Sequence, residues 1–365
     1  MIHIAFTGGG SGGHIYPGLA VAAFLQQQGP CRIFWIGSRG GLDRSIVEGG
    51  GIEFFGIPAG KFRRYFSFRN FLDVFKVLAG FFAARNILKR EKPDLLFSKG
   101  GFVSVPPCLA AASLHIPLCT HESDLSPGLA TRINARFAQR IFTAYEDTAS
   151  FLSRGYKNRI RLTGNPIRPE FRKADAVRGR VFLGINGEER ILLVLGGSQG
   201  AREINDLVRA CLAELTKVYI VVHQTGQSTS WDLAPSERYR PYPYFKEEMP
   251  QVLAASELVL GRSGAGTIWE CAALGRPMVL VPLSGSGTRG DQVENARCFE
   301  KAGAAAVLVG EGLSPQALAE TVLSIAKNEE KRAAMARASA AIGARDGAAS
   351  IAREMTVLLE EKKHG

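Results

Sequence analysis

Short apolar runs alternate with helix-length segments along the chain. Five runs in the first half have the length of buried strands: residues 2–7, 32–37, 94–97, 118–120 and 140–143. The pattern restarts with residues 191–195, 219–222, 257–260, 278–281 and 306–309. Apolar strands that alternate with crossover helices are typical of parallel sheets with both faces covered. The pattern therefore predicts an α/β protein with two parallel-sheet halves.

The chain length and one proline step indicate where these halves meet. At 365 residues the chain exceeds one compact domain of about 150 residues. Asn165-Pro166 and the polar stretch 168–180 suit a linker, because proline interrupts regular structure. We expect domains at 1–163 and 164–341. The sequence after Ser314 is typical of helices, and a C-terminal helix at 342–365 is expected to pack back on the first domain.

Charge narrows the choice of partner. The net charge of +11 favours nucleic acid, an acidic membrane surface or a phosphorylated substrate. The six cysteines show no spacing suited to zinc. The first residues lack the features of a signal peptide. Every apolar stretch is interrupted by Pro, Gly or a charged residue before it reaches the roughly 18 residues that a membrane-spanning helix needs. Any membrane contact is therefore expected to be peripheral.

Three glycine loops each follow a predicted strand and precede a helix. They span residues 8–13, with the helix expected from Pro17 onward, then 196–201 and 261–267. Backbone amides in such loops bind anions at helix N-termini. A single loop would indicate only a tight turn, but three at strand-to-helix junctions indicate phosphate binding. In the third, Glu270 is placed to accept hydrogen bonds from ribose hydroxyls.

Other readings of these segments stay open. Gly8, Gly10 and Gly13 match the spacing of a dinucleotide-binding loop. Arg39 follows the second strand where an NAD enzyme usually has an acid, so NADP is the open alternative. An NADP oxidoreductase would leave the other two loops unexplained. The polar cluster 289–296 is suited either to hydrogen bonding with sugar hydroxyls or to capping a helix.

Five motifs in this order carry a resemblance to a known family: GGSGGH (9–14), HESD (121–124), GNPIR (164–168), GGSQGAR (196–202) and RSGA (262–265). Over essentially the whole chain they resemble the bacterial family 28 glycosyltransferases known as MurG. The resemblance implies a GT-B architecture, with two Rossmann-like parallel-sheet domains facing a shared cleft. It also implies transfer of N-acetylglucosamine from UDP-N-acetylglucosamine to the 4-hydroxyl of MurNAc in lipid I (undecaprenyl-diphospho-MurNAc-pentapeptide), forming lipid II for peptidoglycan synthesis.

The resemblance assigns substrates to domains. The implied contacts of the UDP-sugar are Arg168 at the hinge and, in the second domain, Ser198, Gln199, Asn205, Ala265, Gly266, Thr267, Glu270, Gln292 and Asn295. The implied contacts of the lipid acceptor in the first domain are Ser11, Gly12, Gly13 and Asp124. The chain departs from the family at Asp124 and Phe102, where Asn and Tyr are common. No cofactor is implied, and cell-wall and division proteins are implied partners.

Inverting transfer needs one base to take the proton of the acceptor hydroxyl. His14 is the first candidate because the pKa of histidine lies near operating pH. The alternative for His14 is a helix cap. Glu122, after a buried strand, suits a base, an orienting group or a plain loop salt bridge. Amides and helix N-termini can stabilise the leaving UDP, and no DxD-type carboxylate pair stands out, so we expect no obligatory metal.

Residues 61–90 carry eight Lys or Arg side chains against one acid, Asp73. Apolar residues recur in this segment at helical spacing: Phe68, Phe71, Phe75, Leu78 and Phe82. A basic amphipathic helix is typical of proteins that lie on anionic bilayers. Core packing and RNA binding are the alternatives. We expect no nucleic-acid partner and a peripheral enzyme at the cytoplasmic face of the cell membrane.

Two alternatives to the transferase remain. A UDP-sugar epimerase of GT-B fold would not need the basic aromatic segment. A noncatalytic, membrane-bound nucleotide sensor would not require His14.

Overall fold

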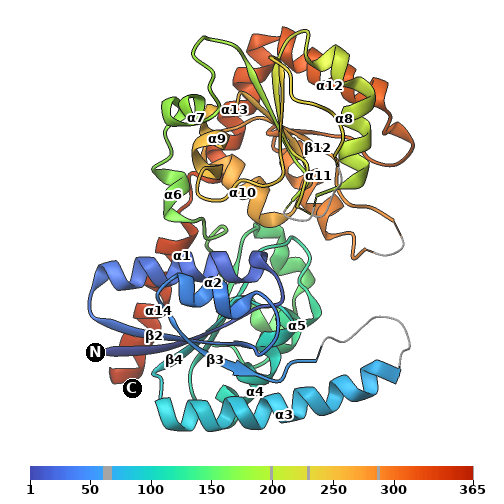
Figure 1. The fold of residues 1–365 in the computed structure, drawn as a ribbon. Helices are drawn as coiled ribbons and strands as arrows, with labels where there is room; N and C mark the ends of the chain where they lie inside the picture. Colours follow the sequence, from blue (N-terminus) through green and yellow to red (C-terminus); the bar gives the residue numbers. More distant parts are fainter. Residues whose placement is uncertain (61–67, 198–199, 228–230, 286–287, 365) are drawn as a thin grey trace. The chain divides into compact units, whose positions relative to one another are not determined.

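The computed structural model describes residues 1–60, 68–197, 200–227, 231–285 and 288–364. It forms two compact units. The N-terminal unit comprises Met1–Arg168 together with Arg345–Gly365, and the C-terminal unit comprises Pro169–Ala344. The chain first leaves the N-terminal unit after Arg168, just beyond the expected hinge at residue 165. In Figure 1 each unit is a sheet with helices on both of its faces.

The sheet of the N-terminal unit has seven parallel strands, in the order β3-β2-β1-β4-β5-β6-β7. They are β1 (Ile2–Thr7), β2 (Cys31–Ser38), β3 (Glu53–Ile57), β4 (Leu95–Ser98), β5 (Leu118–Glu122), β6 (Arg140–Thr143) and β7 (Ile160–Leu162). The five strands expected in this half are confirmed to within two residues at each end. The sequence pattern missed β3 and β7, which are the two edge strands.

Helices cover both faces of this sheet because alternate strand residues point to opposite faces. On one face lie α1 (Gly12–Gln28), α2 (Asp43–Gly49) and α14 (Gly347–His364), packed on Ile4 and Phe6 of β1. On the other lie α3 (Phe68–Glu91), α4 (Val105–Ser113) and α5 (Leu129–Asn134), with Ala5 facing them. The short helices η1 (Phe102–Ser104), η2 (Glu146–Phe151) and η3 (Arg154–Arg159) lie in the connections.

The expected start of the first helix at Pro17 is wrong. Helix α1 begins at Gly12, and Pro17 lies inside it. The proline has no N–H to donate, so the helix continues past it with one backbone bond fewer. Gly12, Gly13 and His14 consequently form the first turn of α1 instead of a loop.

The C-terminal unit has six parallel strands, in the order β10-β9-β8-β11-β12-β13. They are β8 (Ile191–Leu195), β9 (Ile220–Gln224), β10 (Tyr239–Tyr242), β11 (Leu258–Gly261), β12 (Met278–Leu280) and β13 (Ala305–Val307). The five expected strands are confirmed with bounds shifted by up to two residues. The edge strand β10 was missed.

Helices α8 (Arg202–Leu215) and α12 (Pro315–Lys327) pack over one face of this sheet. Helix α7 (Ala176–Phe182) packs on α9 (Met249–Ala255), and α10 (Ala265–Ala273) packs on α13 (Glu329–Gly343). Figure 1 shows these two pairs on the other side of the sheet. The remaining elements are α6 (Pro169–Arg172), α11 (Asp291–Lys301) and η4 (Gly310–Gly312).

The strand order reverses once in each sheet, between β1 and β4 and between β8 and β11. In doubly wound sheets, ligands bind beyond the carboxyl ends of the strands at this switch point. The loops that follow β1 and β4 therefore frame a candidate site in the N-terminal unit. The loops that follow β8 and β11 frame one in the C-terminal unit.

Candidate active site

The glycine loop after β1 is held by hydrogen bonds from side chains of β2 and α2. The indole N–H of Trp35 donates to the carbonyl of Gly8 at 2.9 Å. The carboxylate of Asp43, buried at the start of α2, accepts from the amides of Gly10 at 3.0 Å and Ser38 at 3.1 Å. Asp43 was not among the expected site residues. Its signal in the sequence was an acid shortly after the second strand.

The loop after β4 lies directly against His14. Gly101 has φ 77° and ψ 156°. A Cβ at this position would lie 2.7 Å from the carbonyl oxygen of Gly9 and 2.9 Å from Cδ2 of His14. The loops after β1 and β4 and the His14 ring are therefore in close contact at the switch point.

The first turn of α1 is open to an anion. Ser11 is the exposed N-cap residue, and its side chain makes no capping hydrogen bond. The first amides of a helix have no partner within it, and they carry the positive end of its dipole. Of these amides, that of His14 donates to the Ser11 carbonyl at 3.1 Å. Gly12 and Gly13 add no side chain that would keep a ligand from these amides. This arrangement suits a phosphate or diphosphate.

We predict that Gly101→Ala destabilises the protein by about 1–3 kcal/mol, because its backbone conformation is essentially restricted to glycine. The new methyl group would also press on the His14 ring. Urea unfolding measures the change. The matched control is Gly40→Ala, since Gly40 has an ordinary φ and nothing within 4 Å of an added Cβ. Equal midpoints for the two variants would contradict the prediction.

Glu122 is the last residue of β5, and its carboxylate accepts hydrogen bonds from amides of the loop that follows. One oxygen accepts from the amides of Ser123 at 2.9 Å and Asp124 at 3.1 Å, and the other accepts from the amide of Gly128 at 3.0 Å. The side chain is nearly buried. The geometry makes Glu122 an anchor of the 122–128 loop. Asp124 is half-buried within that loop.

A buried polar network lies at the ends of β4 and β5. The Lys99 ammonium donates to Ser123 Oγ at 2.7 Å, and Ser123 Oγ donates to Asn165 Oδ1 at 2.6 Å. His121 Nε2 donates to the carbonyl of Gly164 at 3.0 Å. Burial, followed by the nearby Lys99 charge, holds the pKa of His121 well below its usual value. Sequence reasoning missed Lys99, although a lysine directly after an apolar strand was a visible signal.

The expected hinge residue Arg168 also lies near the first turn of α1. Its guanidinium is stacked over the ring of Tyr16, 4.9 Å from the centroid. Tyr16 comes two residues after His14 on the same helix. The N-terminal unit therefore brings His14, Arg168 and the glycine loop to one end of α1.

In the C-terminal unit, the loop after β8 turns through glycines with positive φ, Gly197 (82°) and Gly200 (83°). Gln224, buried at the end of β9, donates to the carbonyl of Gly197 at 3.2 Å and accepts from the amide of Phe245 at 3.0 Å. Gln224, which the sequence did not single out, therefore supports this loop. The predicted contacts Ser198 and Gln199 lie outside the described residues.

The loop after β11 leads into α10 with Gly264 as its N-cap. The predicted residues Ala265, Gly266 and Thr267 form the first turn, and all three are partly exposed. Glu270 lies one turn further along and is also partly exposed. The open amides of this turn suit a diphosphate, as in α1.

The predicted residues of α11 lie beside this loop. Ser263 Oγ donates to the carbonyl of Gln292 at 2.7 Å, and Asn295 Nδ2 donates to the carbonyl of Ser263 at 3.5 Å. Gln292 Oε1 accepts from the amide of Leu283 at 3.0 Å. Asn295 is buried and Gln292 is partly exposed. Asn295 therefore supports the loop from within, whereas Gln292 lies closer to solvent.

Asn205 does not join this group. It is buried on α8, where Nδ2 donates to the carbonyl of Thr225 at 2.9 Å and Oδ1 lies 3.1 Å from His223 Nε2. The amide oxygen accepts, so Nε2 carries the proton and Nδ1 accepts from the hydroxyl of Tyr239 at 3.1 Å. Burial lowers the pKa of His223 to about 4, so the ring is neutral. The structure does not support a direct substrate contact by the Asn205 side chain, because both of its ends are engaged.

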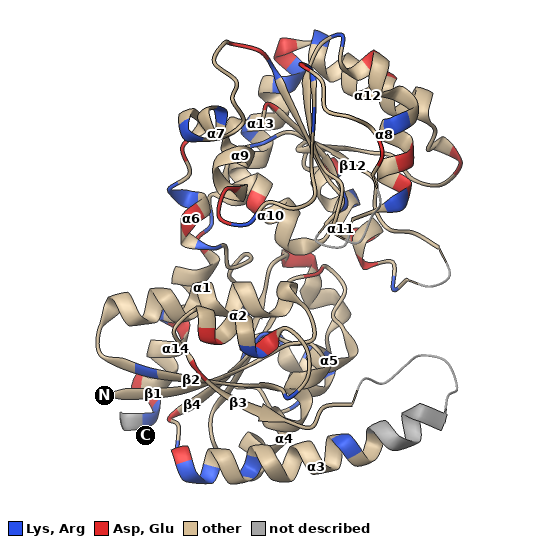
Figure 2. Cartoon of the chain, viewed as in Figure 1, with Lys and Arg blue, Asp and Glu red and all other residues tan. Residues whose placement is uncertain are grey.

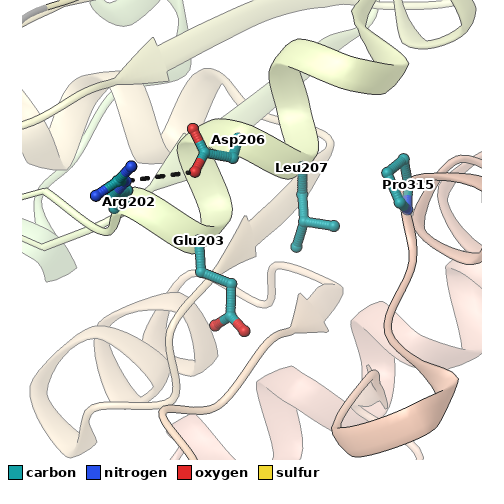
Figure 3. Close-up of a pocket in the computed structure, with 5 residues that line it drawn as sticks. All are labelled: Arg202, Glu203, Asp206, Leu207 and Pro315. Carbon is teal, nitrogen blue, oxygen red and sulfur yellow. Dashed lines mark ion pairs between the residues drawn. The ribbon is translucent and has the colours of Figure 1, made fainter.

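A surface pocket lies at the first turn of α8, directly after the loop that follows β8. Figure 3 shows it lined by Arg202, Glu203, Asp206 and Leu207 of α8 and by Pro315 at the start of α12. Arg202 pairs with Asp206 at 3.7 Å, while Glu203 pairs with Arg262 at 2.7 Å. Two carboxylates against one guanidinium in the lining disfavour an anionic ligand. This pocket is not the candidate nucleotide site.

Comparison with known proteins identifies the family. The model of the glycosyltransferase family 28 N-terminal domain matches residues 4–143, and that of the family 28 C-terminal domain matches residues 191–352. The chain is 48% identical over 376 residues to the UDP-N-acetylglucosamine–N-acetylmuramyl-(pentapeptide) pyrophosphoryl-undecaprenol N-acetylglucosamine transferase of Treponema denticola, covering 96% of each. It is 42% identical over 329 residues to the Clostridium perfringens protein of that name, covering 90% of this chain and 91% of the relative.

Solved structures share the fold. The crystal structure of MurG from Acinetobacter baumannii matches with a TM-score of 0.74 and 24% identity, over 98% of this chain and 99% of that one. A UDP-N-acetylglucosamine 2-epimerase matches with a TM-score of 0.69 and 14% identity, over 99% and 98%. These likenesses establish the GT-B fold, whereas the family follows from the domain models and the sequence relatives. The chain belongs to glycosyltransferase family 28 and is a glycosyltransferase.

Proposed function

We propose that this enzyme transfers N-acetylglucosamine from UDP-N-acetylglucosamine to the 4-hydroxyl of MurNAc in undecaprenyl-diphospho-MurNAc-pentapeptide, forming lipid II for peptidoglycan. The observation that carries the proposal is the nearly full-length similarity to transferases of this name at 42% and 48% identity. The geometry supports it, because each unit has a phosphate-suited helix start at its switch point. One substrate carries a diphosphate in its nucleotide, and the other carries one in its lipid linkage.

We assign the lipid acceptor to the N-terminal unit, with its diphosphate at Ser11, Gly12 and Gly13 and with Asp124 nearby. His14 takes the proton of the attacking hydroxyl as this oxygen displaces UDP in a single inverting step. Glu122 is the weaker candidate for the base, because both of its oxygens already accept backbone hydrogen bonds. Its proposed role is to hold the loop that faces the acceptor.

We assign the UDP-sugar to the C-terminal unit. The first-turn amides of α10 stabilise the charge that develops on the leaving diphosphate, and Glu270 accepts from the ribose hydroxyls. Gln292 reaches the sugar, while Asn295 and Ser263 fix the loop. Ser198, Gln199 and Arg168 complete the proposed set of contacts. In this proposal every role in binding and transfer is taken by a side chain or a backbone amide of the chain itself.

The proposal is tested by measuring UDP release from UDP-N-acetylglucosamine by the full-length protein, with and without a lipid I analogue. Release that depends on the acceptor, together with a disaccharide product, is the expected result. Release without acceptor, or conversion of the donor to an epimer, would refute the transferase. UDP binding with no turnover under either condition would favour a nucleotide sensor.

We further propose that helix α3 attaches the enzyme to the cytoplasmic face of the membrane, beside other cell-wall and division proteins. Phe75, Leu78 and Phe82 are 55%, 50% and 62% exposed, although they are large and apolar. Figure 2 shows Lys and Arg along residues 74–91 of this helix, where the one acid is Glu91 at its end. The other acid of the helix, Asp73, comes before this part. Residues 61–67 lie outside the described part. Within the described residues no helix is long and apolar enough to cross a bilayer.

Replacing Phe75, Leu78 and Phe82 together by serine should weaken binding to anionic vesicles on the order of 100-fold. The three side chains would lose about 3 kcal/mol if each contributes half of its full burial energy in the interface. Vesicle cosedimentation at low and high salt measures the effect. The control is Val177→Ser with Val181→Ser, since both valines are exposed on helix α7. Equal binding by the two variants would rule out α3 as the attachment site.

A further inference from the structure

Lys99 occupies an unusual place for a lysine. It follows β4 at the switch point and is only 2% exposed. Within the described residues its ammonium has one hydrogen-bond partner, Ser123 Oγ at 2.7 Å. Burying an ammonium is costly unless its donors and its charge are matched. Of its three N–H donors only one has a partner among the described residues, so the burial of this ammonium costs stability.

The contacts of Lys99 join three parts of the proposed acceptor site. Ser123, its partner, lies in the turn anchored by Glu122 and donates onward to Asn165, which is buried after β7. The stem of Lys99 lies against the glycine loop, since a Cβ on Gly8 would be 3.1 Å from Lys99 Cβ. The lysine therefore touches the loop after β1 and, through one hydroxyl, holds the turn after β5.

We infer that Lys99 is a positioning residue for the lipid acceptor, whose charged ammonium fixes the 122–124 turn through Ser123 and makes the switch point attractive to the acceptor's diphosphate. The inference rests on the proposed function, which assigns the acceptor to this unit. Lys99 does not touch the reacting atoms. It acts on the turn that carries Asp124 and on the electrostatic potential beneath the glycine loop.

The charge state of Lys99 supplies a pH signature. Burial lowers the pKa of Lys99 to about 8, while the carboxylates of Glu122 and Asp124 oppose the shift. His121 beside it is neutral at this pH, since its own pKa is held well below the usual value. The backbone of His14 also comes close, since a Cβ on Gly8 would be 3.0 Å from its carbonyl oxygen, and residues 163–165 after β7 are neutral. Acceptor use should therefore decline as the pH rises through about 8.

Stability should change in the opposite direction over the same range. The folded pKa of Lys99 lies below the unfolded value of about 10.4, so the folded protein binds this proton less tightly. The cost of the buried charge is fully present below pH 8 and is relieved as the pH rises from about 8 to about 10. A loss of activity in that window then reflects the acceptor site and not unfolding caused by Lys99.

The test measures KM for a lipid I analogue and for UDP-N-acetylglucosamine from pH 6.5 to 9.5, using wild type, Lys99→Met and Ser123→Ala. The Met variant should raise KM for the acceptor about tenfold or more, leave KM for the donor within about twofold, and lose the alkaline decline. Its unfolding midpoint at pH 7 should not fall. Lys92→Met, at an exposed lysine before β4, is the control.

Unchanged acceptor KM and an unchanged alkaline decline in Lys99→Met would overturn the inference. A lower unfolding midpoint with both KM values raised equally would mean that Lys99 is merely structural. If the Met variant does not fold, Ser123→Ala decides: it should raise the acceptor KM and move the decline to lower pH, and an unmoved decline refutes the inference. A wild type that never transfers to the acceptor refutes the proposed function instead.

Discussion

His14→Ala should lower kcat for transfer to a lipid I analogue by about 10²–10⁴-fold, the usual contribution of a general base. His14 lies in the first turn of α1, against the loop after β4, next to the amides proposed for the acceptor's diphosphate. The ring is positioned by packing against Gly101. Its removal should therefore affect the chemical step and leave the KM for UDP-N-acetylglucosamine within about twofold.

The control for this substitution is His115→Asn. His115 is exposed at the end of α4 with φ 57°, a conformation that asparagine tolerates. It should retain wild-type kcat. If His14→Ala keeps more than about a tenth of the wild-type kcat, His14 is not the base. Glu122→Gln then becomes the informative variant, together with its effect on the 122–128 loop.

Ending the chain after Ala344 should leave the N-terminal unit unable to fold. Helix α14 contributes Ile351, Met355, Leu358 and Leu359 to the same core as Ile4 and Phe6 of β1. Four large side chains at about 1.5–3 kcal/mol each amount to about 6–12 kcal/mol, comparable with the whole stability of a typical domain. The truncated protein should be insoluble or lack cooperative unfolding of this unit in calorimetry.

Two milder variants calibrate that result. Met355→Ala should fold and lose about 2–5 kcal/mol by urea denaturation. Ending the chain after Glu360 removes the partly exposed pair between Arg140 and Glu361, which should cost no more than about 1 kcal/mol. A folded, soluble protein ending at Ala344 would show that α14 is dispensable for the core.

The sequence predicted the interior of both sheets well because buried parallel strands are continuous apolar runs. The strands it missed are edge strands. The segment of β10 reads YRPY, and that of β7 reads IRL. Charge and proline are tolerated where one side of a strand has no partner, so periodicity alone does not reveal such strands. The start of α1 was misplaced for a different reason. Proline is typical of the first turn of a helix, whereas Pro17 lies further inside α1.

The candidate site was predictable where it depends on local geometry. Glycine loops between strands and helices are visible in the sequence, and the switch points bring them to the ligand-binding ends of the sheets. The supporting residues Asp43, Lys99 and Gln224 were missed, because each acts on a loop from a different strand or helix. Asn205 is the converse case: it follows a glycine loop in the sequence, but its side chain is bonded to His223 inside the unit.

The order of the two units along the chain determines when each of them can finish folding during synthesis. Its first 168 residues and its last 21 share one core, with the C-terminal unit encoded between them. During synthesis, β1 and α1 leave the ribosome long before α14 exists, so their apolar face stays exposed while the second sheet forms. Helix α14, which is made after the second unit, therefore completes the first unit. A nascent chain that stalls before residue 345 would present that uncovered face to chaperones or proteases.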